Sequence, residues 1–218
     1  MADAPAPISA DAVFEEVLAV AVRTCGNYYN AEDAGDGRLS EWQRDFLIEQ
    51  TRSAWRSFNA HEKPNLSPFR KHFRSYTMQI VFAAAVLTSP REIAYWTTGS
   101  RNAEKEGNGI ASLLRRVVRA RNPQQRTTPV CVSETLSDAD ADGYRHVLHV
   151  SISLDAMPGT GTISVVASKH VDKQLIPLSD AASAILVDPD VPRYKEWCDE
   201  MQSLEEPPAL EEGALVVI

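Results

Sequence analysis

Arginine is concentrated in one stretch of the chain, residues 112–126, which reads SLLRRVVRARNPQQR. The stretch holds five arginines and no acidic residue, although the whole chain of 218 residues has a formal charge of −8. A guanidinium group is planar and presents several N–H donors, so it can bind two oxygens of one phosphate or carboxylate. The chemistry that this stretch predicts is therefore the recognition of anions.

A second basic cluster lies at residues 70–76, RKHFRSY. On a helix Arg115 and Arg119 share a face, because residues four apart lie one above the other. Phe73 and Tyr76 could stack on nucleic-acid bases, but their helical spacing also suits a buried core. The residues predicted to bind nucleic-acid phosphates are Arg70, Lys71, Arg74, Arg101, Arg115, Arg116, Arg119, Arg121 and Arg126.

Charge is segregated along the chain. Residues 1–50 carry 3 basic and 10 acidic side chains, residues 51–126 carry 14 and 4, and residues 127–218 carry 5 and 16. In one interpretation the basic centre binds a polyanion while the acidic flanks limit non-specific binding. In another the flanks pair with the centre, within one molecule or between copies. In a third interpretation the charged side chains are simply exposed to water on helix faces and bind no partner. The sequence leaves all three interpretations open.

Two acidic segments resemble calcium-binding loops, and neither is complete. Residues 32–43 (EDAGDGRLSEWQ) place Gly37 at the sharp turn, but Ala34 stands at the third position and Gln43 replaces the bidentate glutamate at the twelfth. Residues 138–142 have acids at the required spacing but lead into a strand. We therefore expect no bound metal ion.

Catalytic signatures are equally weak. His146 and His149 are three residues apart on a predicted strand, so they should lie on opposite faces of the sheet and not chelate one ion. Cys25 has no histidine near it in sequence. No metalloprotease motif, nucleophile elbow or glycine-rich phosphate loop occurs. The sequence therefore predicts a protein that is not an enzyme and has no cofactor. An enzyme whose active-site residues are dispersed along the chain ranks third among the possible functions.

Apolar residues at helical spacing predict a helical bundle over residues 9–122. Ser9 should cap the first helix, and Ser40 with Gln43 should form a capping box for the second. A third helix should follow Ser67 with an apolar second half, which is typical of a helix in the middle of a bundle. A short helical segment is expected after Ser89, and a last helix over 110–122 that Pro123 ends.

Beyond residue 122 the apolar period changes from helix to strand. Alternation over 144–155 and 163–171 predicts an antiparallel hairpin, and residues 129–133 a third strand. Short helices near 179–187 and 191–203 should close this part, residues 123–204, which can belong to the same domain as the bundle. The fold class is therefore α+β and mainly α, with helices and strands segregated along the chain.

The two ends of the chain differ in character. Residues 1–8 are rich in alanine and proline and should form a flexible arm. Residues 205–218 combine an acidic, proline-containing linker with an apolar tail. Such a tail can add to a sheet edge of a neighbouring copy, or fold back onto its own sheet. The residues predicted to mediate self-association are Leu215, Val216, Val217 and Ile218.

These features together predict a non-enzymatic, self-associating protein that binds nucleic acid, as a coat protein or nucleoprotein does. The expected nucleic acid is RNA, and the expected location is the cytoplasm or a virion. The longest apolar run, residues 80–87, is too short to cross a bilayer, so no membrane is expected. The alternative from another class is a cytosolic adaptor or regulator whose arginine-bearing helices bind an acidic protein.

Overall fold

The computed structural model describes the chain in nine stretches. These are residues 9–25, 39–60, 73–97, 100–125, 129–137, 145–154, 159–168, 182–187 and 214–217. Several features predicted from the sequence lie outside them: the arm over 1–8, most of the calcium-like loop at 32–43, the acidic turn at 138–142, the helix at 191–203 and the linker at 205–212.

Four helices make up the N-terminal half of the described chain. They are α1 (Ala10–Thr24), α2 (Glu41–Asn59), α3 (Arg74–Thr88) and α4 (Ser100–Arg121). The Ala12 amide donates to Ser9 Oγ at 3.2 Å, and the Ser40 amide donates to Gln43 Oε1 at 3.0 Å. Both predicted N-terminal caps are therefore confirmed, since each satisfies an amide that a helix start leaves without a partner.

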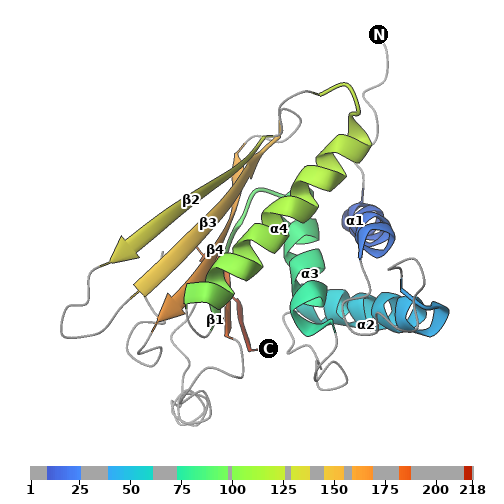
Figure 1. Cartoon of the computed structure of the whole chain (residues 1–218), viewed down its shortest axis with the longest axis horizontal. Coiled ribbons are helices and arrows are strands. Elements are labelled where there is room, and N and C mark those ends of the chain that lie inside the picture. Colours follow the sequence, from blue (N-terminus) through green and yellow to red (C-terminus); the bar gives the residue numbers. More distant parts are fainter. Residues whose placement is uncertain are drawn as a thin grey trace.

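Helix α3 lies at the centre of the fold, between α1 and α2 on one side and α4 and the sheet on the other (Figure 1). Every residue from Ile80 to Leu87 is buried, with α1 and α2 on one side and α4 and β4 on the other. The prediction of a central helix that is apolar almost all round is confirmed. Phe73 and Tyr76 also belong to this core or pack against it, and the Tyr76 hydroxyl donates to the Ala21 carbonyl at 2.9 Å.

Six strands form one mixed sheet in the order β2-β3-β4-β1-β5-β6. β2 pairs antiparallel with β3, and β3 with β4, whereas β1 runs parallel to both β4 and β5, and β5 parallel to β6. The strand bounds are β1 (Glu92–Thr97), β2 (Val130–Ser137), β3 (Arg145–Ser153), β4 (Thr160–Ser168), β5 (Ala182–Val187) and β6 (Ala214–Val217).

The fold is α+β, as predicted, and the predicted hairpin and third strand are the β2-β3-β4 meander. Three predictions are wrong. The sheet is a mixed one of six strands and not a small antiparallel one, because β1, β5 and β6 join it through parallel pairing. The segment after Ser89 is strand β1 and not a helix, because Ile93 and Tyr95 alternate with residues on the other face and pair with β4. Residues 182–187, expected in a helix, form strand β5 beside β1.

Helix α4 begins ten residues earlier than the predicted start at residue 110. Gly107 and Gly109 lie inside it. Both glycines allow close packing, because a Cβ at Gly107 would overlap with the Leu148 side chain and one at Gly109 would lie 2.6–2.7 Å from the Gln79 amide. The helix ends at Arg121, near the predicted end.

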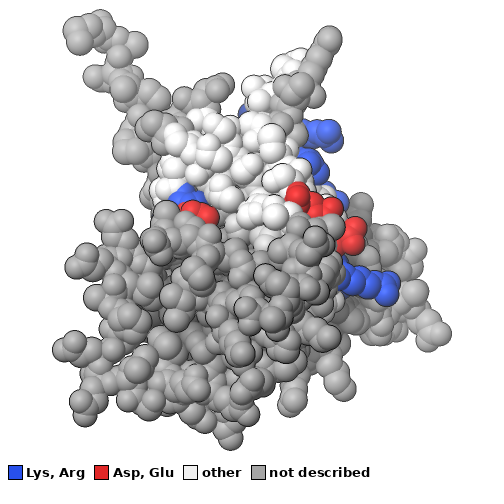
Figure 2. All heavy atoms as spheres, turned by 90° about the vertical axis from the view of Figure 1, so that its left-hand side faces the viewer, with Lys and Arg blue, Asp and Glu red and all other residues white. Residues whose placement is uncertain are grey.

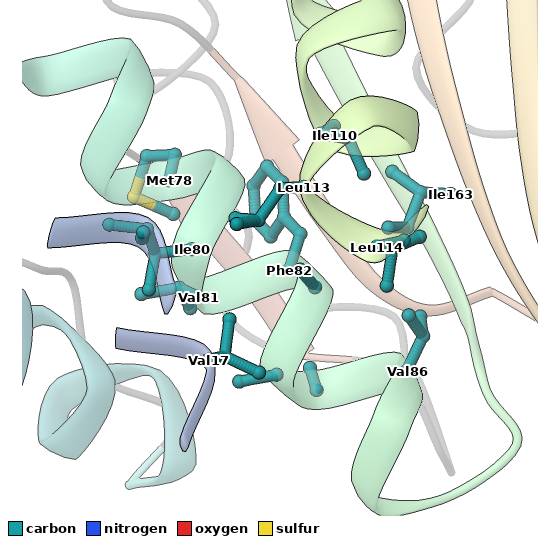
Figure 3. Close-up of a cluster of buried hydrophobic side chains, with 14 of the residues drawn as sticks. Val17, Met78, Ile80, Val81, Phe82, Val86, Ile110, Leu113, Leu114 and Ile163 are labelled. Carbon is teal, nitrogen blue, oxygen red and sulfur yellow. The ribbon is translucent and has the colours of Figure 1, made fainter. Parts of the chain in front are cut away.

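The helices and the sheet share one hydrophobic core, part of which Figure 3 shows. Helix α4 crosses the inner face of the sheet over β3 and β4 and also contacts α1 and α3 (Figure 1). Its buried residues meet β4 on one side and α3 on the other. The side chains that join these layers include Val17, Phe82, Val86, Ile110, Leu113, Leu114 and Ile163.

Candidate nucleic-acid interface

Helix α4 has one apolar and one basic face. The predicted inner face is confirmed, because its residues are all buried: Ile110, Leu113, Leu114, Val117 and Val118. Five cationic side chains that recur at helical spacing on the other side form what we call the α4 stripe. At a rise of about 1.5 Å per residue the stripe is about 27 Å long. Its members are Arg101, Lys105, Arg115, Arg116 and Arg119, of which only Arg115 is half-buried.

The stripe cations make no salt bridge with any side chain in the described stretches. Arg121 differs, because its guanidinium donates to both carboxylate oxygens of Glu16 in α1 at 2.8–3.0 Å. Arg52 in α2 likewise donates to both oxygens of Glu15 at 2.7 Å. Acidic residues of the N-terminal flank therefore neutralise two arginines of the basic centre, and the stripe lies outside these pairs.

Helix α4 carries two acidic residues, and one of them is turned inward. Glu106 is buried and accepts a hydrogen bond from Gln79 Nε2 of α3 at 2.7 Å. Glu104 is exposed on the same side of the molecule as the stripe. The solvent-exposed face of α4 is therefore more basic than its sequence, since half of the helix's negative charge is withdrawn into the interior.

Arg116 also lies close to the end of α1. Burial raises the pKa of the Cys25 thiol to about 11, while the positive charge of Arg116 acts in the opposite direction. Cys25 is the residue that caps α1, where helix carbonyls concentrate partial negative charge. The exposed guanidinium of Arg116 therefore lies near the C-terminal end of α1.

The remaining predicted binding residues are placed only in part. Arg70, Lys71 and Arg126 lie outside the described residues. Arg74 is the first residue of α3, and only its backbone is described. The structure thus brings together Arg101, Arg115, Arg116 and Arg119 on one helix, and it separates Arg121 from them through the pair with Glu16.

Lys105 was missed by the sequence interpretation because the helix was started at residue 110. Its spacing supplies the signal that could have found it. Positions 101, 105, 108, 112, 115 and 119 recur at intervals of three or four and are all polar, so they trace one helix face across both glycines.

The outer face of the sheet, away from α4, holds a second group of polar side chains. His149 Nδ1 lies 2.9 Å from Ser164 Oγ, which is on the neighbouring strand. Burial lowers the pKa of His149, and the negative charge of Glu92 offsets part of that shift. His146 projects from the opposite face of β3, where its Nε2 lies 2.5 Å from Glu134 Oε1. The prediction that the two histidines lie on opposite faces is confirmed.

This group has the residue types of an acyl-transfer site but not its surroundings. Ser164 lies within β4, flanked by His149 of β3 and Ala94 of β1. Backbone amides in that position belong to the sheet ladder, whereas an oxyanion must be met by amides that are free to donate. Figure 2 views the molecule from the β2 side, and the described surface at its centre is largely uncharged.

Within the described stretches, no three histidine, cysteine, aspartate or glutamate side chains gather as metal ligands would. None of the described helices combines the length and the hydropathy that a bilayer crossing requires. Comparisons of the chain with protein-family models, with curated proteins and with solved structures found no significant match.

Proposed function

We propose that this chain is a non-enzymatic, self-associating protein that binds nucleic acid through the α4 stripe, in the manner of a coat protein or nucleoprotein. RNA is the proposed nucleic acid, and the cytoplasm or a virion the proposed location. One observation carries the proposal. Five cations follow one helix face over about 27 Å, and none of them is neutralised by a described carboxylate.

The preference for arginine supports phosphate as the ligand. Four of the five stripe residues are arginine, whose fork matches two phosphate oxygens and which is more weakly hydrated than lysine. The length of the stripe exceeds what one phosphate would occupy, so a chain of phosphates uses it better than a single anion does. Binding of this kind depends on salt, because each neutralised phosphate releases condensed counterions.

The test removes two stripe arginines and measures RNA binding against salt concentration. Arg115→Ala with Arg119→Ala should weaken binding to single-stranded RNA and lower the log–log salt slope by about 0.7 for each lost contact. The matched control is Arg52→Ala with Arg56→Ala, which removes the same charge from α2. Equal affinity and slope in the folded stripe variant and the wild type would exclude α4 from the interface.

An acidic protein partner is the competing proposal for the same stripe, because carboxylates also accept paired guanidinium donors. The ratio of absorbance at 260 and 280 nm in the purified protein separates the two. Co-purified nucleic acid should raise the ratio in the wild type and not in the stripe variant. A wild-type ratio typical of protein alone, together with no RNA binding, would favour the adaptor.

A further inference from the structure

Strand β2 forms one edge of the sheet. It comprises eight residues, Val130–Ser137, and the order of strands begins with it. No described strand or helix pairs with its outer side, where Figure 1 shows it at the margin of the fold. Proteins usually protect such an edge with lysine, proline, a bulge or a very short strand, because its free amide and carbonyl groups attract another strand.

β2 has none of these protective features. Its register with β3 is unbroken over eight residue pairs, and the strand contains no lysine, arginine or proline. Its single charged residue, Glu134, contacts His146 of the same molecule. Cys131, Ser133 and Thr135 are exposed on the outer face and are all small. The edge is therefore long, regular and almost uncharged.

The backbone groups of β2 that point away from β3 can be assigned. The Ser153 amide donates to the Pro129 carbonyl at 3.3 Å, so these opposite residues form a hydrogen-bonded pair. In an antiparallel ladder such pairs alternate with non-hydrogen-bonded ones. The residues whose amide and carbonyl groups point away from β3 are consequently Val130, Val132, Glu134 and Leu136.

We propose that this edge binds the β2 strand of a second copy, antiparallel and about a two-fold axis. The strand can pair with its own copy, since the pairing sets only small side chains opposite each other on the outer face and brings no two charged residues directly opposite on the inner face. The register that places Ser133 on the axis sets Val132 opposite Glu134 and Cys131 opposite Thr135. Moving the axis to Glu134 would set two carboxylates directly opposite, which is unfavourable.

A two-fold axis through a continuous antiparallel sheet keeps corresponding faces on the same side. Both α4 helices, which cover the inner face, would therefore lie on one side of the joined sheet. Their two stripes would face the same nucleic acid. The proposed β2 pairing depends on only one part of the proposed function, the self-association of the chain. Its experiments contain no nucleic acid, so that the β2 pairing and the nucleic-acid binding can each fail while the other stands.

The first experiment measures the mass of the nuclease-treated full chain by light scattering. The wild type should be a dimer. Ser133→Lys with Thr135→Lys should be a monomer with an unchanged circular dichroism spectrum, because four lysines would meet at the contact. The control, Ser153→Lys with Gln124→Lys, adds equal charge at exposed positions off the edge and should remain a dimer. A monomeric wild type, or a folded dimeric Ser133/Thr135 variant, would overturn the proposal.

The second experiment tests the register, and it does so even if the lysine variant does not fold. In a Cys131→Ser, Cys198→Ser background, Ser133→Cys should form an intermolecular disulfide on mild oxidation. Non-hydrogen-bonded partners lie about 4.5 Å apart at Cα, within the range for a disulfide.

In the same background Thr135→Cys should not cross-link, because its two copies would be four residues, about 13 Å, apart along the strands. Cross-linking of Thr135→Cys alone would overturn this register. Truncation after Glu212 removes strand β6, which pairs with β5 at the opposite edge of the sheet. A dimer that is lost on this truncation, but kept in the lysine variant, would instead assign the contact to the β6 edge and overturn the β2 proposal.

Discussion

Gly109→Ala should destabilise the protein, although the same change in an exposed helix normally stabilises it. Alanine is favoured over glycine inside a helix by about 0.8–1.0 kcal/mol. At this position, however, the new Cβ would lie 2.6–2.7 Å from the Nε2, Oε1 and Cδ atoms of Gln79. That amide donates to the buried carboxylate of Glu106, so moving it removes the one hydrogen bond described for a buried acid.

The expected magnitude follows from these two opposing effects. A buried polar group that loses its partner costs about 1–3 kcal/mol, and more if it is charged. After the gain in helix propensity is subtracted from this cost, Gly109→Ala should lower the free energy of unfolding by about 1–2 kcal/mol. In a Gln79→Ala background the clash is absent, so Gly109→Ala should raise the free energy of unfolding by about 0.8–1.0 kcal/mol.

Urea denaturation of the four chains that combine these two substitutions measures the coupling directly. The sign of the Gly109→Ala effect should reverse between the two backgrounds, with a coupling of about 2–3 kcal/mol. Asn108→Ala, at the exposed neighbouring position, serves as the control and should stabilise by no more than about 0.7 kcal/mol. An equal effect of Gly109→Ala in both backgrounds would show that the glycine does not provide space for Gln79, and the packing argument would fail.

Two further predictions concern the core of α4 and the outer face of the sheet. Leu114→Ala should lower the free energy of unfolding by about 2–5 kcal/mol, because the side chain is buried. Arg116→Ala, at an exposed position, should change it by less than about 0.5 kcal/mol. Equal changes at both positions in urea denaturation would contradict the assignment of a buried and an exposed face to α4. The imidazole of His149 should titrate below 6.5 by NMR, because burial lowers its pKa. Below pH 6.5 the unfolded chain therefore binds more protons at His149 than the folded chain does, so the free energy of unfolding should fall as the pH is lowered through this range. An NMR titration midpoint of His149 above 6.5 would contradict its burial.

Elements whose pattern is local were predictable from the sequence. Ser9 and Ser40 cap helices through bonds to residues three positions away, so the signal and its partner lie in one short segment. Strand β1 was not predictable in this way, because its pairing partners, β4 and β5, lie far along the chain. The Ser-Pro pair before it is a common helix start, and tertiary pairing overrode that local preference.

The error at α4 has a different physical origin. Glycine lowers the probability of a helix locally, but here Gly107 and Gly109 let α4 approach β3 and α3 closely. Sequence alone does not reveal which residues face a glycine, so the N-terminal half of the helix and Lys105 were missed. The inner and outer faces of the C-terminal half were predictable, because Leu113, Leu114, Val117 and Val118 repeat at helical spacing.

Folding pairs some arginines of the basic centre with acidic residues and leaves others outside such pairs. The acidic N-terminal flank does pair with the basic centre, through Glu15 with Arg52 and Glu16 with Arg121. These pairs are at least partly exposed and contribute little to stability. A guanidinium that is already held by a carboxylate must give up that bond before it binds another anion, so these two arginines are less available than the α4 stripe for the proposed binding of phosphate. Among the described residues, the four arginines of the α4 stripe make no such pair, and they lie along a single face of α4.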